Sequence, residues 1–267
     1  MKAIDITLTP ISAIGRFVLF IIEELGRLAI FFFHGLILIF RYPFQTLKIL
    51  EQIHIIGAKS VFVIALTGGF TGMVLGLQGY YTLVQFGSEG MLGAAVGLTL
   101  VRELGPVFAA IMITARAGSA MAAEVGIMRI SEQIDALETM GINPVRFLFS
   151  PRLASALISF PLLNSIFDVV GIFVGFLCGS VLLGIISGIY FSHMTSSIVM
   201  ADITGGYIKS IAFGALITTI CCYQGYYTHT RRDGFGAKGV GQATTSAVVF
   251  SSVTVLVIDY VITSFLL

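Results

Sequence analysis

Residues 153–186 read LASALISFPLLNSIFDVVGIFVGFLCGSVLLGII, an apolar run in which Asp168 is the only charged residue. A helix needs about 20 such residues to cross the hydrocarbon core of a bilayer, so this stretch predicts a membrane span. Four further runs are comparably long and apolar, at residues 58–83, 91–115, 207–228 and 243–267. The sequence therefore predicts an all-α membrane protein with about five transmembrane helices.

The composition of the whole chain supports the same class. Hydrophobic residues make up 57% of the 267 residues and charged residues 11%, whereas soluble domains average roughly 45–50% and 25%. The formal net charge is +1, and no basic cluster is dense enough to indicate nucleic-acid binding. The three cysteines lie in apolar stretches without metal-ligand spacing. We therefore predict no metal site and no cofactor.

Basic residues are distributed unevenly between the predicted spans. They precede the first span, and they recur between the second and third spans and between the fourth and fifth. The segments near 84–90 and 187–206 contain none, so we expect these to be outer loops. Because cytoplasmic segments carry an excess of Lys and Arg, we predict a cytoplasmic N-terminus and a C-terminus on the opposite side.

The N-terminal region carries a different pattern. Five polar side chains recur at intervals of 7, 4, 7 and 7 residues, along one side of a largely apolar helix: Arg16, Glu23, Arg27, His34 and Arg41. Such a stripe is typical of a helix that lies in the membrane interface. We predict an interfacial amphipathic helix within residues 1–50, ahead of a five-span core at residues 55–267. An ordinary spanning helix with a few tolerated charges is the alternative.

Two adjacent charges, Arg102 and Glu103, fall near the middle of the second predicted span and directly precede Gly105-Pro106. A charged side chain at the bilayer centre costs on the order of 2.5–3.5 kcal/mol on insertion scales. Neighbouring helical residues point about 100° apart, so these two cannot fully neutralise each other. They either tie the span to another helix, with Asp168 and Asp259 as candidate partners of Arg102, or line a wet cavity.

The segment between the second and third spans has the pattern of an amphipathic helix. Its small and apolar residues recur at intervals of 3, 4, 3 and 4: Ile127, Ile130, Ile134, Leu137 and Gly141. Acidic residues occupy another face, and Asn143-Pro144 ends the pattern. We predict a short cytoplasmic helix that could transmit motion from a soluble motor protein. A helix that merely floats at the headgroups is the alternative.

Several motifs at fixed spacing then suggest a family. In order along the chain they are Leu-Val-Arg102-Glu103-Leu-Gly-Pro106, Ala115-Arg116-Ala-Gly118-Ser119-Ala120, Ala123-Glu124-Val-Gly126-Ile-Met128-Arg129 and Glu132-Gln133-Ile-Asp135. Upstream, Gly72-Met-Val-Leu75-Gly76-Leu-Gln78-Gly79 belongs to the same set, as does Ser150-Pro151-Arg152 downstream. Together they resemble the MlaE/YrbE family of permeases over nearly the whole chain after residue 55.

This resemblance implies a single transmembrane permease domain over residues 1–267, set in the inner membrane with its C-terminus in the periplasm. It further implies a lipid transporter of the ABC type, which moves phospholipids or related lipids between the inner membrane and the outer envelope. The implied partners are a second copy of the chain, cytoplasmic ABC ATPase subunits, a periplasmic MCE-domain hexamer and, in many systems, a STAS-domain protein. The sequence contains no Gly-x-x-x-x-Gly-Lys-Ser/Thr loop, so we expect no ATPase site of its own.

The resemblance also directs attention to two groups of residues. We expect a lipid pocket near the dimer axis, where one face of the first span meets the charged pair at comparable depth: Leu75, Gln78, Thr82, Leu83, Phe86, Arg102 and Glu103. We expect the cytoplasmic helix to couple to the ATPase through four charged residues: Arg129, Glu132, Asp135 and Glu138.

An ion-coupled secondary carrier or channel is the alternative function. Glu103, Asp168 and Asp259 would then relay protons across the membrane. Such a carrier does not require an amphipathic cytoplasmic helix, and it often contains inverted repeats, which the sequence does not display.

Overall fold

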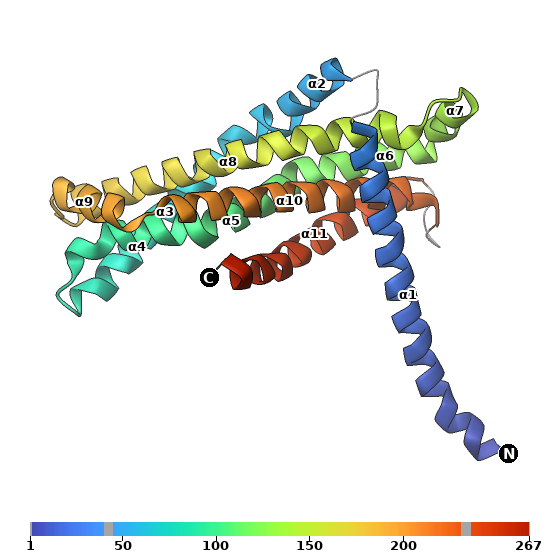
Figure 1. Ribbon diagram of the computed structural model, residues 1–267, viewed down its shortest axis with the longest axis horizontal. Helices are drawn as coiled ribbons and strands as arrows, with labels where there is room; N and C mark the ends of the chain where they lie inside the picture. The colour runs from blue at the N-terminus through green and yellow to red at the C-terminus, as the bar shows by residue number, and fades with distance from the viewer. Residues whose placement is uncertain (1, 40–44, 231–235, 267) are drawn as a thin grey trace.

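The structure is a computed structural model that describes residues 2–39, 45–230 and 236–266, and within these ranges it contains helices and no strand. Most of the helices run side by side in one elongated bundle (Figure 1). Five segments are long and apolar enough to cross a membrane: Thr46–Val84, Glu89–Ile130, Val145–Leu182, Met200–Tyr226 and Gly236–Leu266. The predicted all-α class with five spans is therefore confirmed.

The first span begins earlier than the sequence predicted. It comprises α2 (Thr46–Ile56), the short turn η1 (Ala58–Ser60) and α3 (Val61–Val84). Arg116 of the second span stabilises the break between α2 and α3, because its guanidinium donates to the Ile55 carbonyl at 2.7 Å and to Ser60 Oγ at 2.8 Å. A side chain from a neighbouring helix thus supplies a donor where the regular helix is interrupted.

The second span extends well beyond the predicted residues 91–115. It consists of α4 (Leu92–Thr99), α5 (Gly105–Ile113) and α6 (Ser119–Ile130), joined by the wide π-helical turns η3 (Leu100–Leu104) and η4 (Thr114–Gly118). The charges that appeared to end this span have partners inside the protein, since Arg116 binds the α2–α3 break and Glu124 pairs with Arg152 at 3.0 Å. Single π turns within helices are frequent at functional sites.

Glycines bring the first and third spans into close contact. The third span comprises η5 (Val145–Phe149), α8 (Ser150–Leu177) and η6 (Cys178–Leu182). Gly72 of α3 lies against the backbone of Gly171 on α8, where any side chain would collide with the Gly171 carbonyl. Such contacts between small residues hold helices together in lipid, where no hydrophobic force drives their association.

The segment 187–206, which we expected to be an outer loop, is helical instead. Helix α9 (Ser187–Ser197) packs along α4, and α10 (Met200–Tyr226) begins only a few residues later. Gly93 and Gly97 of α4 permit this contact, because they lie against Tyr190 and Met194. The turn η7 (Thr228–Thr230) and the long helix α11 (Gly236–Leu266) complete the fold.

Helix α1 (Lys2–Ile39) crosses one end of the bundle instead of running alongside it (Figure 1). Its end is attached through Phe31, whose ring centroid lies 4.6 Å from that of Phe149, and through Ser150 Oγ, which donates to the Gly35 carbonyl at 3.0 Å. The polar stripe from Arg16 to His34 is largely exposed, and Arg41 lies outside the described residues. This arrangement suits an interfacial helix, which remains a prediction.

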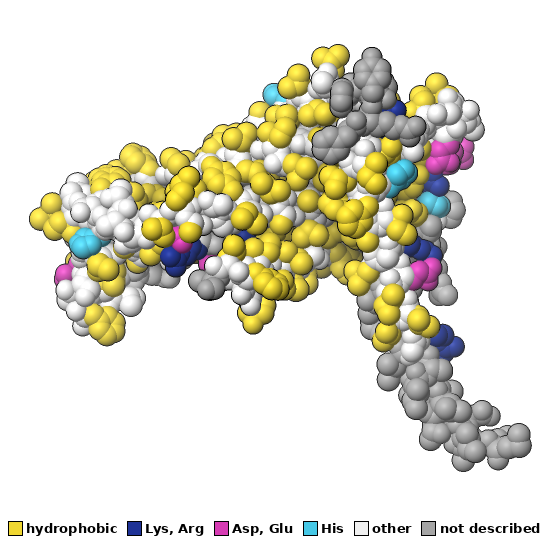
Figure 2. Space-filling model, viewed as in Figure 1, with side chains coloured by type: hydrophobic (Ala, Val, Ile, Leu, Met, Phe, Trp, Pro, Cys, Tyr) yellow, Lys and Arg dark blue, Asp and Glu magenta, His cyan; other side chains and the backbone are white. Residues whose placement is uncertain are grey.

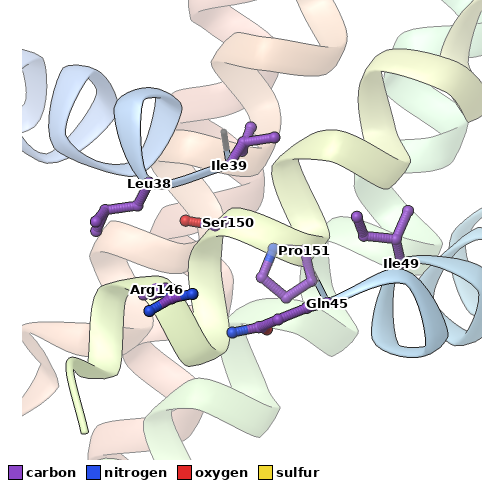
Figure 3. Close-up of a pocket in the computed structure, with 7 residues that line it drawn as sticks. All are labelled: Leu38, Ile39, Gln45, Ile49, Arg146, Ser150 and Pro151. Atoms are coloured by element: carbon purple, nitrogen blue, oxygen red, sulfur yellow. The ribbon is translucent and has the colours of Figure 1, made fainter. Parts of the chain in front are cut away.

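A small cavity lies where α1 and α2 approach the start of α8 (Figure 3). Its volume is about 10 Å³, and Gln45, Ser150 and Pro151 are among its lining residues. This volume corresponds to roughly one water molecule, so the cavity is too small to bind a lipid.

Most charged side chains on the visible face gather at the end of the bundle where α1, α6 and α7 (Gln133–Thr139) lie (Figure 2). Along the rest of the bundle this face is mainly hydrophobic, and a few charged groups interrupt it.

Candidate functional site

Lys209 of α10 is the most buried charged side chain among the described residues, with 2% of its surface exposed. Its Nζ donates to Glu103 Oε2 on η3 at 2.6 Å and lies 3.0 Å from Asp259 Oδ1 on α11. Thr263, one turn beyond Asp259, donates to the Asp259 carbonyl at 2.8 Å, and its hydroxyl also lies 3.3 Å from Glu103 Oε1. These four residues, here called the Lys209 cluster, connect the second, fourth and fifth spans.

Pro106 explains a further bond of the lysine. Lys209 Nζ also donates to the carbonyl oxygen of Arg102 at 2.9 Å. In a regular helix this carbonyl would accept from the N–H of residue 106, and proline has no N–H. The ammonium of the fourth span therefore supplies a donor that Pro106 removes from the second.

Two carboxylates share one ammonium in the Lys209 cluster, and they differ in exposure. The Glu103 side chain is 41% exposed and that of Asp259 is 17% exposed. Asp259 Oδ1 is close enough to Lys209 for an ion pair, yet it has no hydrogen bond of good geometry from the described residues. Glu103 is therefore the member of the cluster that a bound molecule can reach most easily.

Arg102 has a different partner from those expected. Its Nε donates to Asp202 Oδ1 at 2.7 Å, and the second Asp202 oxygen accepts from the Val199 N–H at 3.0 Å, which caps α10. Arg102 does tie its span to another helix, but the candidate partners Asp168 and Asp259 are wrong, because Arg102 pairs with Asp202 and Asp259 pairs with Lys209. Asp202 escaped notice because the sequence placed it in an outer loop, whereas it lies in the first turn of α10.

Most of the predicted face of the first span lies on the C-terminal half of α3, and Phe86 follows its last turn. Leu75 and Leu83 are partly buried against the core, while Gln78, Thr82 and Phe86 are exposed. Thr82 Oγ1 donates to the Gln78 carbonyl at 3.0 Å, so this hydroxyl is satisfied within its own helix.

This face of α3 and the charged pair lie at different depths within one subunit. Leu92, at the N-terminal end of α4, packs against Gly79, whereas Leu100 packs against Gly171. At about 1.5 Å per helical residue, the two levels are on the order of 12 Å apart. The structure therefore does not bring Gln78 together with Arg102 and Glu103 inside a single chain.

The helix between the second and third spans, which we predicted to be cytoplasmic, is shorter than its sequence pattern predicted. The pattern from Ile127 to Gly141 falls on two helices, because α6 continues to Ile130 and α7 begins only at Gln133. Glu132 separates them with a left-handed φ of 58°, a conformation that interrupts a right-handed helix. Ile134 still points into the protein and is fully buried.

Contacts here called the α7 clasp bind α7 to the end of α10 and to η7. Arg129 of α6 pairs with Asp135 Oδ1 at 2.7 Å and donates from Nε to His229 Nδ1 at 2.9 Å. The Tyr226 hydroxyl donates to Glu138 Oε1 at 3.3 Å. Three of the four predicted coupling residues therefore belong to one network, while Glu132 lies exposed beside it.

The protonation state of His229 fits this network. Burial and the neighbouring Arg129 guanidinium lower the pKa of His229. A lowered pKa favours the neutral imidazole, whose Nδ1 can accept a hydrogen bond from Arg129.

Comparison with known proteins identifies the family of this chain. The family model described as Permease MlaE matches residues 49–265. The chain belongs to the MlaE permease family. The resemblance inferred from the sequence motifs is thereby confirmed.

Three relatives of this MlaE-family permease illustrate the range of organisms in which similar chains occur. The intermembrane phospholipid transport system permease protein MlaE of Haemophilus influenzae is 39% identical over 95% of this chain and 96% of its own. A probable ABC transporter permease protein of Rickettsia typhi is 38% identical, over 96% of each chain. The chloroplastic protein TRIGALACTOSYLDIACYLGLYCEROL 1 of Arabidopsis thaliana is 37% identical over 81% of this chain and 60% of its own. These names lend no support to an ion-coupled carrier.

Sequence reasoning missed several residues of this MlaE-family permease that the structure places at the site. Lys209 carried the clearest signal, since an ionisable residue within a predicted span is by default a functional candidate with a partner to be sought. Thr263 and His229 carried no comparable signal, because nothing in the spacing relates them to Glu103 or Arg129. Their roles become apparent only from the packing of α11 and η7.

Proposed function

We propose that this chain is the permease subunit of an ABC-type transporter that moves phospholipids between the inner membrane and the outer envelope. The family match over residues 49–265 carries this proposal, together with the near full-length relative named as an intermembrane phospholipid transport permease. Five apolar spans suit a membrane subunit that relies on a separate ATPase for energy. The unequal distribution of basic residues supports a cytoplasmic N-terminus and a periplasmic C-terminus.

The transporter we envisage contains two copies of this chain, cytoplasmic ATPase subunits and a periplasmic MCE-domain hexamer, with a STAS-domain protein as a further partner. Gln78 and Arg102 lie at different depths, which supports an elongated lipid path along the membrane normal, and we propose that two copies supply its walls. In this arrangement Leu75, Gln78, Thr82 and Leu83 of α3, and Phe86 just beyond its end, line the lipid path. The half-exposed Glu103 side chain would meet the lipid at the inner end of that path.

The Lys209 cluster would control the path by holding three spans in one arrangement. A lipid that competes for Glu103 would loosen the contact between η3 and α10, because the same carboxylate binds Lys209 at 2.6 Å. Lys209 would retain its bonds to Asp259 and to the Arg102 carbonyl. The buried Lys209 ammonium therefore has a partner both with and without its bond to Glu103, which lowers the free-energy difference between these two states.

The α7 clasp would transmit force from the ATPase. A push on α7 reaches α10 through Glu138 and Tyr226, and reaches η7 through Arg129 and His229. Lys209 lies on the same helix as Tyr226, roughly 25 Å further along at 1.5 Å per residue. A rigid displacement of α10 would therefore carry the motion from the cytoplasm to the Lys209 cluster.

Purification followed by reconstitution tests this proposal. In mild detergent the chain should bring an ATPase subunit with it, and the purified complex in liposomes should move labelled phospholipid only when ATP is supplied. An ionophore that abolishes ion gradients should leave this transport unchanged. Transport that is lost with the gradient and does not need ATP would favour the carrier instead.

A further inference from the structure

The two carboxyl oxygens of Asp168, on α8, have unequal surroundings. Oδ2 accepts a hydrogen bond from the Asn164 amide at 3.2 Å. Oδ1 is buried and has no hydrogen-bond donor among the described residues. The Asn164 side chain is almost fully buried, with 3% exposed, and its own Oδ1 also lacks a partner. The described part of the chain therefore leaves two buried acceptors side by side without a matching donor.

Backbone atoms close off the unpaired oxygen of Asp168. It packs against Gly105, where any side chain would collide with it. A Cβ atom at that position would also lie 2.8 Å from the Leu100 carbonyl oxygen, so two acceptors face the same narrow space. A cavity of about 220 Å³ lies between α8 and α10. Because Asp168 Oδ1 is buried against Gly105, a molecule in that cavity does not reach this oxygen.

The elements around this part of α8 offer no free cation among the described residues. Their charged groups pair with one another: Arg102 with Asp202, and Lys209 with both Glu103 and Asp259. Helices α3, α4 and α5 contain no charged residue. On α10, the Tyr207 hydroxyl shares a hydrogen bond of 2.7 Å with Ser165 of α8. A carboxylate in an apolar surrounding requires a counter-charge or takes up a proton, and here the counter-charge is missing.

We propose that Asp168 binds a proton in the folded protein and acts as a neutral carboxylic acid. A proton on Oδ1 converts an unpaired acceptor into a donor, and it is small enough for the closed space against Gly105. The oxygens available to accept from it are the Leu100 carbonyl and Asn164 Oδ1.

The bound proton has a structural consequence for the Lys209 cluster. It lets α8 pack directly against Gly105 without burying a charge, and Gly105 lies only two residues beyond Glu103. Asp168 is therefore a positioning residue for η3, and loss of its proton at alkaline pH should loosen the contact between α8 and η3. This inference does not depend on the proposed transport function.

Infrared spectroscopy of the purified full chain tests the proposal, because the C=O stretch of a protonated carboxyl is separate from the bands of a carboxylate. At neutral pH, the spectrum of wild type minus that of Asp168→Asn should contain one protonated-carboxyl band, which shifts in D₂O. Asp135→Asn is the matched control, because Asp135 is half-exposed and pairs with Arg129. Its difference spectrum should contain no such band. Absence of the band for Asp168→Asn would overturn the proposal.

The pH dependence of unfolding provides a second readout. An aspartate of the unfolded chain is ionised at neutral pH, so unfolding releases the proposed proton and the stability of wild type falls as the pH rises. Asp168→Asn resembles the neutral acid in size and hydrogen bonding but has no proton to release. It should therefore fold, with a Tm at least equal to that of wild type at neutral pH.

The two proteins should diverge as the pH is raised from mildly acidic to neutral values. For each pH unit, the ratio of folded to unfolded protein should fall about ten-fold more in wild type than in Asp168→Asn, as expected for one linked proton. Parallel pH curves would overturn the proposal. Failure of Asp168→Asn to fold would overturn it as well, because it would show that the site requires the charge.

Discussion

The Lys209 cluster and the α7 clasp both connect the fourth span to other elements through charged side chains, but in opposite surroundings. Lys209 is 2% exposed, whereas in the clasp the Arg129 side chain is 15% exposed and that of Asp135 is 53% exposed. Removing one partner of a buried ion pair typically costs about 3–5 kcal/mol, while an exposed pair contributes about 0–1 kcal/mol. The comparison suggests that the cluster fixes how the spans pack and that the clasp can be displaced by a partner protein.

The largest effect is expected from Lys209→Met. This change leaves Glu103 and Asp259 facing each other without their ammonium, so we expect a loss of about 3–5 kcal/mol in unfolding free energy. Thermal unfolding in detergent should reveal a clear drop in Tm. The exposed Lys59 provides the matched control, and Lys59→Met should leave Tm nearly unchanged. Equal Tm values for the two variants would show that the cluster does not stabilise the fold.

Pro106→Ala sharpens the account of that cluster. Alanine restores the N–H that the Arg102 carbonyl lacks, so part of the role of Lys209 becomes redundant. In a double-mutant cycle, Lys209→Met should cost less in the Pro106→Ala background, by about 0.5–3 kcal/mol, the usual coupling range for residues of one network. Strict additivity would mean that the bond from Lys209 to this carbonyl is incidental.

A change in the α7 clasp should have little effect on stability. It should instead clearly weaken the coupling between ATP hydrolysis and lipid movement. Arg129→Gln removes the bonds to Asp135 and His229, and because the Asp135 carboxylate is half-exposed the change in unfolding free energy should be smaller than for Lys209→Met, about 1 kcal/mol. In the reconstituted complex it should lower the amount of lipid moved per ATP hydrolysed. Charge reversal at Glu132 tests docking of the ATPase separately from force transmission, because Glu132 is exposed beside the clasp and not part of it. Normal coupling in Arg129→Gln would limit the clasp to a local structural role.

The smallest expected effect is a pH dependence of the clasp. Because the folded state lowers the pKa of His229 from its ordinary 6.5, the fold favours the neutral imidazole. The resulting stabilisation is complete above the unfolded pKa and is lost as the pH falls through the folded value. Tm should therefore decline slightly more steeply below pH ~6.5 in wild type than in His229→Asn. Parallel pH curves for the two proteins would contradict this assignment.

The sequence was sufficient for the class and number of the spans, because apolar runs of about 20 residues are typical of helices that cross a bilayer. It failed at the ends of the spans wherever a charge has a partner inside the protein. The predicted second span ends at residue 115, just before Arg116, whereas the helix continues to Ile130 and bonds from Arg116 to Ile55 and from Glu124 to Arg152 hold this extension in the protein.

The candidate site was only half predictable, and for a physical reason. Arg102 and Glu103 attracted attention because they are charges within an apolar run, but their partners depend on which helices pack together. Periodicity also cannot reveal a single left-handed residue, so Glu132 split a pattern that looked continuous. Family motifs supplied the function, whereas the connection through Lys209 required three spans to be placed in space.

The most direct test of the central claim is ATP-driven lipid movement by Glu103→Gln in proteoliposomes that contain the complete complex. This variant keeps the size of the side chain and removes the charge that binds Lys209. We predict that the complex still assembles and hydrolyses ATP, while phospholipid movement falls about ten-fold or more, as expected when ~1.4 kcal/mol of a required interaction is lost. Full transport by Glu103→Gln, and also by Glu103→Ala, would contradict the claim that the Lys209 cluster controls the lipid path.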